Sequence, residues 1–204
     1  MKYKITPLIV YLLIAFSSQA QTKVVGECSV QFDIEQFQSQ EWQHIGQKTI
    51  YIKGSQCKTT LITPKLVQTL IFTSLQDTAI LLKEIGDSKF LQHVNFPPKT
   101  IPTLVTMKKL YADSVIMIAG YNCNALQLVF SDQTKYELYY TTSIIPTIPY
   151  FEMAFKDIPG LVLSYSITTN KGVPVRYTAK QVDLSPITLN QFEFNSNDYQ
   201  IIDQ

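Results

Sequence analysis

The chain lacks most of the side-chain groupings that carry enzymatic chemistry. Its only two histidines are His44 and His93, and neither is followed within two to four residues by a Cys, a His or an acid. Glu41 stands three residues before His44, but it lies in a Gln-rich stretch that is not typical of a zinc site, which needs three or four ligands. We therefore predict no metal site, and we expect His93 to be an ordinary strand residue with a satisfied ring.

Glycine is also scarce, and the seven glycines are spread along 204 residues. No glycine-rich loop is present to hold a phosphate, and no Gly-x-Ser-x-Gly motif is present to expose a nucleophile. The acids Asp33, Glu35, Glu137 and Glu152 fall on the wet faces of predicted strands or in loops, which favours solvated surface charge over a paired-carboxylate site. Cys123 lies within a predicted strand, after Gly120, so we expect its side chain to be packed or disulfide-bonded and not to act as a nucleophile. We predict a protein that is not an enzyme and that has no cofactor.

An excess of charge of either sign is absent. The full chain has 17 basic and 16 acidic residues. Such a balance leaves no electrostatic footprint for nucleic acid and no polybasic patch for anionic lipid. We expect no nucleic-acid partner.

The first twenty residues have the three regions of a secretory signal peptide, in order. Lys2 and Lys4 form a basic region, Pro7 to Phe16 is nearly all apolar, and small residues precede Gln21. The apolar run is too short to cross a bilayer comfortably, and no later segment is long enough. We predict cleavage near Ala20 and an exported chain, periplasmic or secreted, with no transmembrane segment in residues 21–204.

Alternating side chains dominate the rest of the chain. Cys28, Val30, Phe32 and Ile34 alternate with polar residues, which is typical of a strand with one buried face. The polar stretch Gln36 to Gly46 is interpreted as a connection. Further strands are predicted by similar patterns and by turn signals between them, at 48–53, 57–63, 67–73, 78–85, 89–94, 115–119, 122–130, 135–141, 161–169 and 173–184.

These short strands, with at most one or two helical turns at Tyr150 to Lys156, predict a mostly β fold. We expect a single curved antiparallel sheet or half-barrel over residues 21–204, with covering loops and at most a short helix. Residues 190–202 are expected to form an extended tail.

Several segments, in order, resemble one exported bacterial family, domain of unknown function 4412, which is similar in style to the GLPGLI-type proteins. They are YIKG (51–54), KEIG (83–86), IAGYNC (118–123), ELYYT (137–141), IPGLVLSY (158–165), YTAK (177–180) and the Phe192–Tyr199 spacing. Val162 and Ser164 stand where the family has Pro and an acid, which weakens any catalytic role for that loop. The resemblance implies a plan like that of periplasmic lipoprotein-carrier domains, in which a curved open sheet wraps a hydrophobic cavity.

The chain has three cysteines, Cys28, Cys57 and Cys123. Either they are small buried apolar residues, or two of them form a single disulfide. If a bridge forms, we favour Cys28 with Cys123, because Cys28 lies on the predicted inner face and Cys123 lies in the family-like IAGYNC segment. Cys57 would then keep its thiol.

Aromatic residues recur along the predicted strands. On a concave sheet some of them would line a cavity for an apolar ligand, while the alternative is that they only fill the core. The candidate lining residues are Phe130, Tyr136, Tyr140, Tyr165 and Tyr177. The sequence thus favours an exported binding module for an apolar small molecule or lipid. A second hypothesis is an envelope structural or interaction module that binds a protein through an exposed sheet edge.

Overall fold

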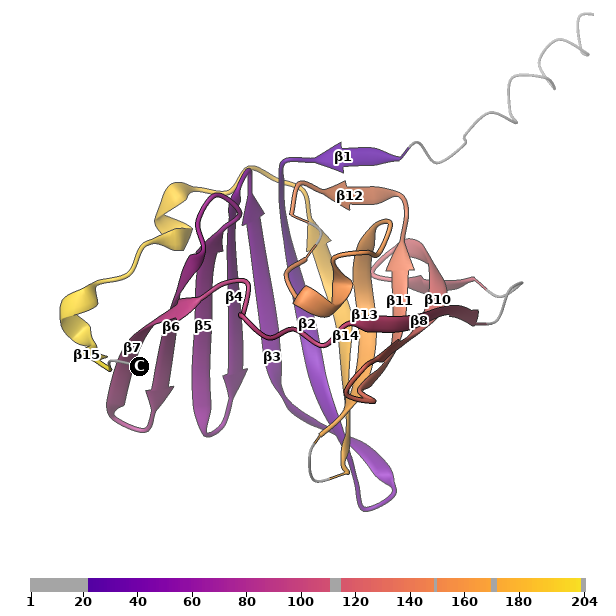
Figure 1. Ribbon diagram of the computed structural model, residues 1–204, viewed down its shortest axis with the longest axis horizontal. Helices are drawn as coiled ribbons and strands as arrows, with labels where there is room; N and C mark the ends of the chain where they lie inside the picture. Colours follow the sequence, from indigo (N-terminus) through magenta and orange to yellow (C-terminus); the bar gives the residue numbers. More distant parts are fainter. Residues whose placement is uncertain (1–21, 111–114, 149, 170–171, 203–204) are drawn as a thin grey trace, which may run out of the picture.

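One large, strongly curved sheet makes up most of the molecule (Figure 1). The computed structural model describes residues 22–110, 115–148, 150–169 and 172–202. The N-terminal residues, on which the predicted signal peptide falls, lie outside the described residues. The mostly β, curved and unclosed fold predicted from the sequence is confirmed.

Strands β2 to β7 lie side by side in chain order, and β2 then pairs on its other side with β14, which joins the two halves of the chain in one sheet. The large sheet has the order β15-β7-β6-β5-β4-β3-β2-β14-β13-β11-β10-β8, with β9 also paired to β10. All its pairs are antiparallel except β15 with β7, and a separate parallel pair joins β1 to β12. The strand bounds are β1 Lys23–Val25, β2 Glu27–Gln38, β3 Glu41–Lys53, β4 Gln56–Thr63, β5 Leu66–Thr73, β6 Thr78–Ile85, β7 Ser88–Asn95, β8 Leu104–Leu110, β9 Ile116–Ile118, β10 Tyr121–Phe130, β11 Lys135–Thr141, β12 Ile144–Pro146, β13 Leu161–Thr168, β14 Pro174–Asp183 and β15 Gln200–Ile201.

The alternation in β2 sets which face of the sheet is buried. Cys28, Val30, Phe32 and Ile34 are all 1% exposed or less, whereas Gln31 between them is exposed. The register carries this inner face across the neighbouring strands, because opposite residues in a ladder share a face. The main core therefore forms on the concave side of the sheet.

The interpretation of Gln36 to Gly46 as a connection is wrong. β2 and β3 continue through it as a long hairpin, with a tight turn at Ser39 and Gln40. The stretch is polar because the hairpin extends beyond the core and most of it is exposed. Trp42 packs at its end against Phe37, with ring centroids 5.4 Å apart, and under the guanidinium of Arg176.

Two irregular segments lie over the concave face. Residues 96–103, here called the strap, cross from β7 at one side of the sheet to β8 at the other (Figure 1). Residues 150–160, here called the covering loop, contain one 3₁₀ turn, η1 (Met153–Phe155). Phe151, Phe155 and Ile158 of this loop are buried in the core, as is Phe96 of the strap. Both segments are held to the sheet by these apolar side chains.

The C-terminal segment covers the β7 edge of the sheet. It is less extended than predicted, with two 3₁₀ turns, η2 (Leu189–Phe192) and η3 (Ser196–Asp198), before β15 pairs with β7. The Lys58 ammonium donates to the Gln191 carbonyl over 2.7 Å, and the Tyr199 hydroxyl donates to Glu84 over 2.9 Å. Within the described residues, no helix is long and apolar enough to cross a membrane.

The three cysteines are buried and their thiols are free, so the favoured Cys28–Cys123 bridge is not formed in the structure. Cys28 and Cys57 lie in one cross-strand row, with Ile52 of β3 directly between them. Burial raises the pKa of Cys28 and of Cys123 to about 11, and it raises that of Cys57 further.

Thiol titration tests this state of the cysteines. A raised pKa means that the thiol stays protonated, so at pH 8 only about one Cys28 or Cys123 in a thousand is the reactive thiolate. We expect Ellman's reagent to label all three cysteines of the unfolded protein, and to label the folded protein at least about a hundredfold more slowly. Recovery of only one thiol after unfolding without reductant would contradict the free state.

Candidate functional site

Three adjoining cavities lie on the concave face, beneath the strap and the covering loop. They share lining residues: Glu152 joins the first to the second, Gln68 and Leu70 join the second to the third, and Pro98 and Thr100 join the third to the first. We call the three together the concave groove.

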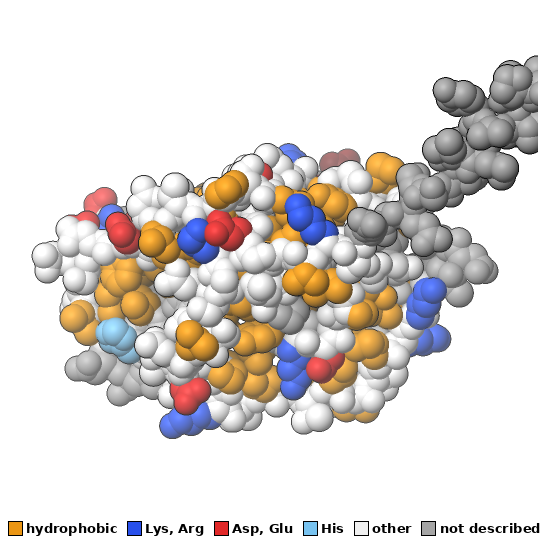
Figure 2. Space-filling model, turned by 90° about the horizontal axis from the view of Figure 1, so that it is seen from above, with side chains coloured by type: hydrophobic (Ala, Val, Ile, Leu, Met, Phe, Trp, Pro, Cys, Tyr) orange, Lys and Arg blue, Asp and Glu red, His pale blue; other side chains and the backbone are white. Residues whose placement is uncertain are grey.

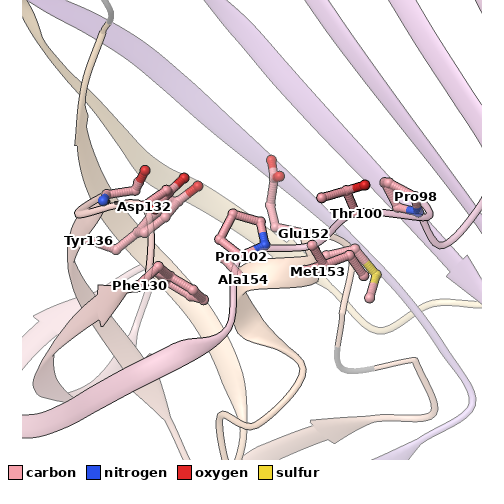
Figure 3. Close-up of a pocket in the computed structure, with 11 residues that line it drawn as sticks. Pro98, Thr100, Pro102, Phe130, Asp132, Tyr136, Glu152, Met153 and Ala154 are labelled. Atoms are coloured by element: carbon pink, nitrogen blue, oxygen red, sulfur yellow. Dashed lines mark hydrogen bonds between the residues drawn. The ribbon is translucent and has the colours of Figure 1, made fainter.

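The first, here called the tyrosine cavity, has a volume of about 210 Å³. Phe130 of β10 and Tyr136 of β11 form one side, with their rings edge to face and their centroids 5.8 Å apart. Figure 3 shows these two rings on the opposite side from Met153 of the covering loop and Pro98 of the strap. Two of the residues predicted to line a ligand cavity therefore lie together here.

The second, here called the lysine cavity, also has a volume of about 210 Å³. Its apolar wall is formed by Leu61, Leu70 and Phe151, and Tyr177 lines it as well. Lys48 of β3 also lines the lysine cavity, and this residue is only 6% exposed to solvent. A charged group at such a place needs a partner, because removing it from water is costly.

Glu152 of the covering loop is that partner. The Lys48 ammonium forms an ion pair with the Glu152 carboxylate and donates to the Tyr165 hydroxyl over 3.0 Å. It also lies 5.5–5.6 Å from the ring centroids of Phe151, Tyr165 and Tyr177, within the range of cation–π attraction. The interpretation of Glu152 as solvated surface charge is therefore wrong.

The tyrosines around this pair are held in their neutral form. Burial first, and then the nearby Glu152 carboxylate, raise the pKa of Tyr177 to about 12. The same two causes raise the pKa of Tyr165, which is fully enclosed. The rings of Tyr165 and Tyr177 stack with their centroids 4.4 Å apart. Both phenols therefore stay protonated at neutral pH, and the Tyr165 hydroxyl accepts from Lys48 and donates to Glu152 over 3.3 Å.

The third, here called the leucine cavity, is a depression widely open to solvent and has the largest volume of the groove, about 580 Å³. Leu70, Leu81, Val94 and Phe96 supply its apolar surface, and Lys99 and Thr100 of the strap lie at its border. The volume exceeds the roughly 300 Å³ that a drug-sized or lipid-like ligand needs. The residues that line it were not among those named from the sequence.

The five aromatic residues named from the sequence do not act as one group. Phe130 and Tyr136 line the tyrosine cavity, and Tyr177 lines the lysine cavity. Tyr165 is 2% exposed and belongs to the core, where its hydroxyl accepts a hydrogen bond from Lys48. Tyr140 is half-buried against the core and lines none of the three cavities.

Sequence reasoning missed Lys48, although a signal was present. Lys48 is in phase with Ile50 and Ile52, so period-two alternation already places it on the buried face of β3. A lysine on an otherwise apolar face indicates either a buried partner or a ligand. No local pattern points to Glu152, which is 104 residues away in the chain.

Two of the remaining polar candidates, Asp33 and Glu35, line a separate cavity of about 410 Å³ together with Arg176 and Lys180. Glu35 pairs with Arg176 at 2.7 Å and Asp33 with Lys180 at 2.5 Å, both on the face opposite the groove, and Glu137 is exposed. Among the residues that the structure describes, no three His, Cys, Asp or Glu side chains come together as a metal site. His44 and His93 are exposed strand residues.

Comparison with known proteins supports the fold alone. No family model matches the chain, so the resemblance to domain of unknown function 4412 stays a prediction, and no curated protein matches its sequence. An uncharacterised conserved protein from Thermus thermophilus is 10% identical, with a TM-score of 0.51 and coverage of 98% of this chain and 100% of that one.

Two other solved structures are less similar. MucB in its complex with MucA from Pseudomonas aeruginosa is 11% identical, with a TM-score of 0.47, and the matched region covers 86% of this chain and 58% of that one. A LolA superfamily protein from Nitrosomonas europaea is 12% identical, with a TM-score of 0.36 and coverage of 82% and 90%. Both likenesses are weaker than that to the Thermus protein.

Proposed function

We propose that this protein is an exported, non-enzymatic binding module that holds an apolar or lipid-like ligand in the concave groove. The observation that carries the proposal is the leucine cavity, whose volume of about 580 Å³ is bounded by Leu70, Leu81, Val94 and Phe96. Ligand sites are typically concave and mostly apolar, with a few polar groups that orient the ligand. The adjoining lysine cavity supplies such polar groups.

The surroundings of the groove agree with a binding role. The strap and the covering loop are irregular segments that lie across a rigid antiparallel sheet, an arrangement in which loops can adjust to a ligand while the scaffold stays fixed. Charged side chains on the face seen in Figure 2 are scattered in small groups of both signs, which does not favour a polyanionic partner.

A fluorescent apolar dye tests the proposal. We expect N-phenyl-1-naphthylamine to bind the purified protein with enhanced emission, and we expect Leu70→Trp to weaken that binding by about tenfold or more, because the indole fills the space that two cavities share. Val67→Trp is the matched control, since Val67 is a half-buried residue of the same strand on the opposite face. Fluorescence titration measures both.

The control should stay within about twofold of the parent protein, a difference well under 1.4 kcal/mol. Circular dichroism checks that each variant is folded. Absence of dye binding to the parent protein, or equal weakening by the two substitutions, would overturn the proposal.

A second candidate function is protein interaction through a sheet edge. β8 is the last strand at its end of the sheet, and Val105 and Met107 on it are 64% and 40% exposed. An edge strand with free backbone groups can add a strand from a partner. The opposite edge, β7, is partly paired with β15.

A further inference from the structure

Lys48 is unusual in the inner face of the sheet. Among the described residues it is the one charged side chain that is buried, at 6% exposure. Its cross-strand neighbours are Phe32 on β2 and Leu61 on β4, both on the apolar side of the sheet. A cation fixed in such surroundings requires an anion, because an uncompensated charge there would be strongly destabilising.

The carboxylate that neutralises Lys48 in the structure belongs to a residue outside the sheet. Glu152 belongs to the covering loop, and its side chain is 36% exposed, while that of Lys48 is 7% exposed. Lys48 is held in place by sheet residues, through the Tyr165 hydroxyl at 3.0 Å and the stacked Tyr177 ring. The cation is thus a fixed part of the floor, and the carboxylate lies on a covering segment in contact with both the tyrosine and the lysine cavities.

A second polar group in the same cavity has no oxygen or nitrogen partner. The Thr59 residue is 8% exposed, and its buried hydroxyl has only the thiol of Cys57 beside it as a hydrogen-bonding group among the described residues. Thr59 lines the lysine cavity together with Lys48. Leaving a buried hydroxyl unpaired is unfavourable, so an acceptor oxygen placed in this cavity would gain a hydrogen bond that the protein alone does not supply.

The apolar part of the groove begins directly beside these polar groups. Leu70 and Gln68 line both the lysine cavity and the larger leucine cavity. A molecule with its head on Lys48 would therefore direct an attached chain toward Leu81 and Val94. One buried ammonium matches one negative charge, and the position that Glu152 occupies is already shaped for a carboxylate.

We infer that the ligand of the groove is a long-chain monocarboxylic acid, whose carboxylate takes the place of Glu152 on Lys48 and whose hydrocarbon chain fills the leucine cavity. This inference rests on the proposed function, since it names the class of ligand for the same groove. Glu152 then occupies the head-group position when the groove is empty and gives it up when the acid binds.

Competition between matched ligands tests the inference. Dodecanoic acid and dodecan-1-ol have the same chain and differ at the head group, so each is titrated against bound N-phenyl-1-naphthylamine at pH 8 and fixed salt. We expect the acid to displace the dye about tenfold more effectively than the alcohol, as a charge-assisted hydrogen bond to a buried ammonium implies. Lys48→Met should remove that preference and leave dodecan-1-ol binding within about twofold.

Two further variants separate the head-group site from general charge. Lys83→Met is the control, because Lys83 is a half-buried lysine in the same cross-strand row as Lys48 but does not line the lysine cavity. It should keep the preference for the acid. Glu152→Gln removes the competing carboxylate and should tighten dodecanoic acid binding several-fold, with no change for dodecan-1-ol.

The outcomes distinguish this inference from the proposed function beneath it. Equal displacement by the acid and the alcohol, with dye binding intact, would overturn the inference and leave the apolar site standing. A preference that survives Lys48→Met would also overturn it. If the Lys48→Met variant does not fold, the Glu152→Gln variant decides. Weaker binding of dodecanoic acid to that variant than to the parent protein would overturn the inference. Failure of dye, acid and alcohol alike to bind the parent protein would overturn the proposed function itself.

Discussion

Replacement of Phe32 by alanine is expected to lower the free energy of unfolding by roughly 3–5 kcal/mol, the range for emptying a packed aromatic position. Phe32 is 1% exposed, and its ring centroid lies 6.1 Å from that of Phe151 and 6.2 Å from that of Tyr165. Phe151 belongs to the covering loop and Tyr165 to β13, so the cavity would loosen the contact between that loop and the sheet. Urea denaturation followed by circular dichroism measures the change.

Gln31→Ala is the matched control for this experiment. Gln31 is the preceding residue of the same strand, and its side chain is exposed on the opposite face. Removing an exposed polar side chain away from any special contact should alter stability by no more than about 0.5 kcal/mol. Similar losses for the two variants would mean that the inner face of β2 is not where the core lies.

Replacement of Gly160 by alanine is expected to destabilise the protein by about 3 kcal/mol or more, at or beyond the upper end of ordinary overpacking. A Cβ atom at this position would lie 2.0 Å from the Thr141 carbonyl oxygen and 2.9 Å from its carbon. These are backbone atoms at the end of β11, and Thr141 pairs with Leu161, so no side-chain rotation relieves the overlap. The start of β13 would have to move away from β11.

Thermal and urea unfolding of Gly160→Ala and Gly26→Ala, side by side, measure this effect. At Gly26 a Cβ atom would meet nothing within 4 Å, so its substitution should change stability by about 0.5 kcal/mol or less. A Gly160→Ala variant as stable as Gly26→Ala would contradict the close approach of β11 to residue 160. Gly160 lies in the IPGLVLSY segment, so part of that family-like pattern has a packing reason.

Part of the candidate site could be predicted from the sequence. Phe130, Tyr136 and Tyr177 were named as possible lining residues, and each does line a cavity of the groove. The alternation of residues along each strand places these side chains on one face of the sheet, and that alternation can be seen in the local sequence alone. Lys48 could have been found by the same reasoning, since it is in phase with two buried isoleucines of β3.

The leucine cavity could not be predicted from the sequence, because its lining residues come from several strands and from the strap. Leu70 and Leu81 meet only because β5 pairs with β6 in one particular register, and Phe96 reaches them only because the chain turns back over the sheet there. A shift of one residue in that register would send the same leucines to the other face. Sequence patterns indicate strands, but they do not specify such a register.

What the sequence by itself determined is the class of fold and the buried face of its strands, because both follow from a period of two residues and from turn-forming residues between strands. The tertiary structure alone decided the path of the strap and the meeting of Lys48 with Glu152 across 104 residues. These features depend on contacts between distant segments, whose free energy comes from packing and from the burial of charge. The polar head of the groove is of this second kind: a lysine from β3, a threonine from β4 and a glutamate from a covering loop share a cavity only after the whole sheet has formed.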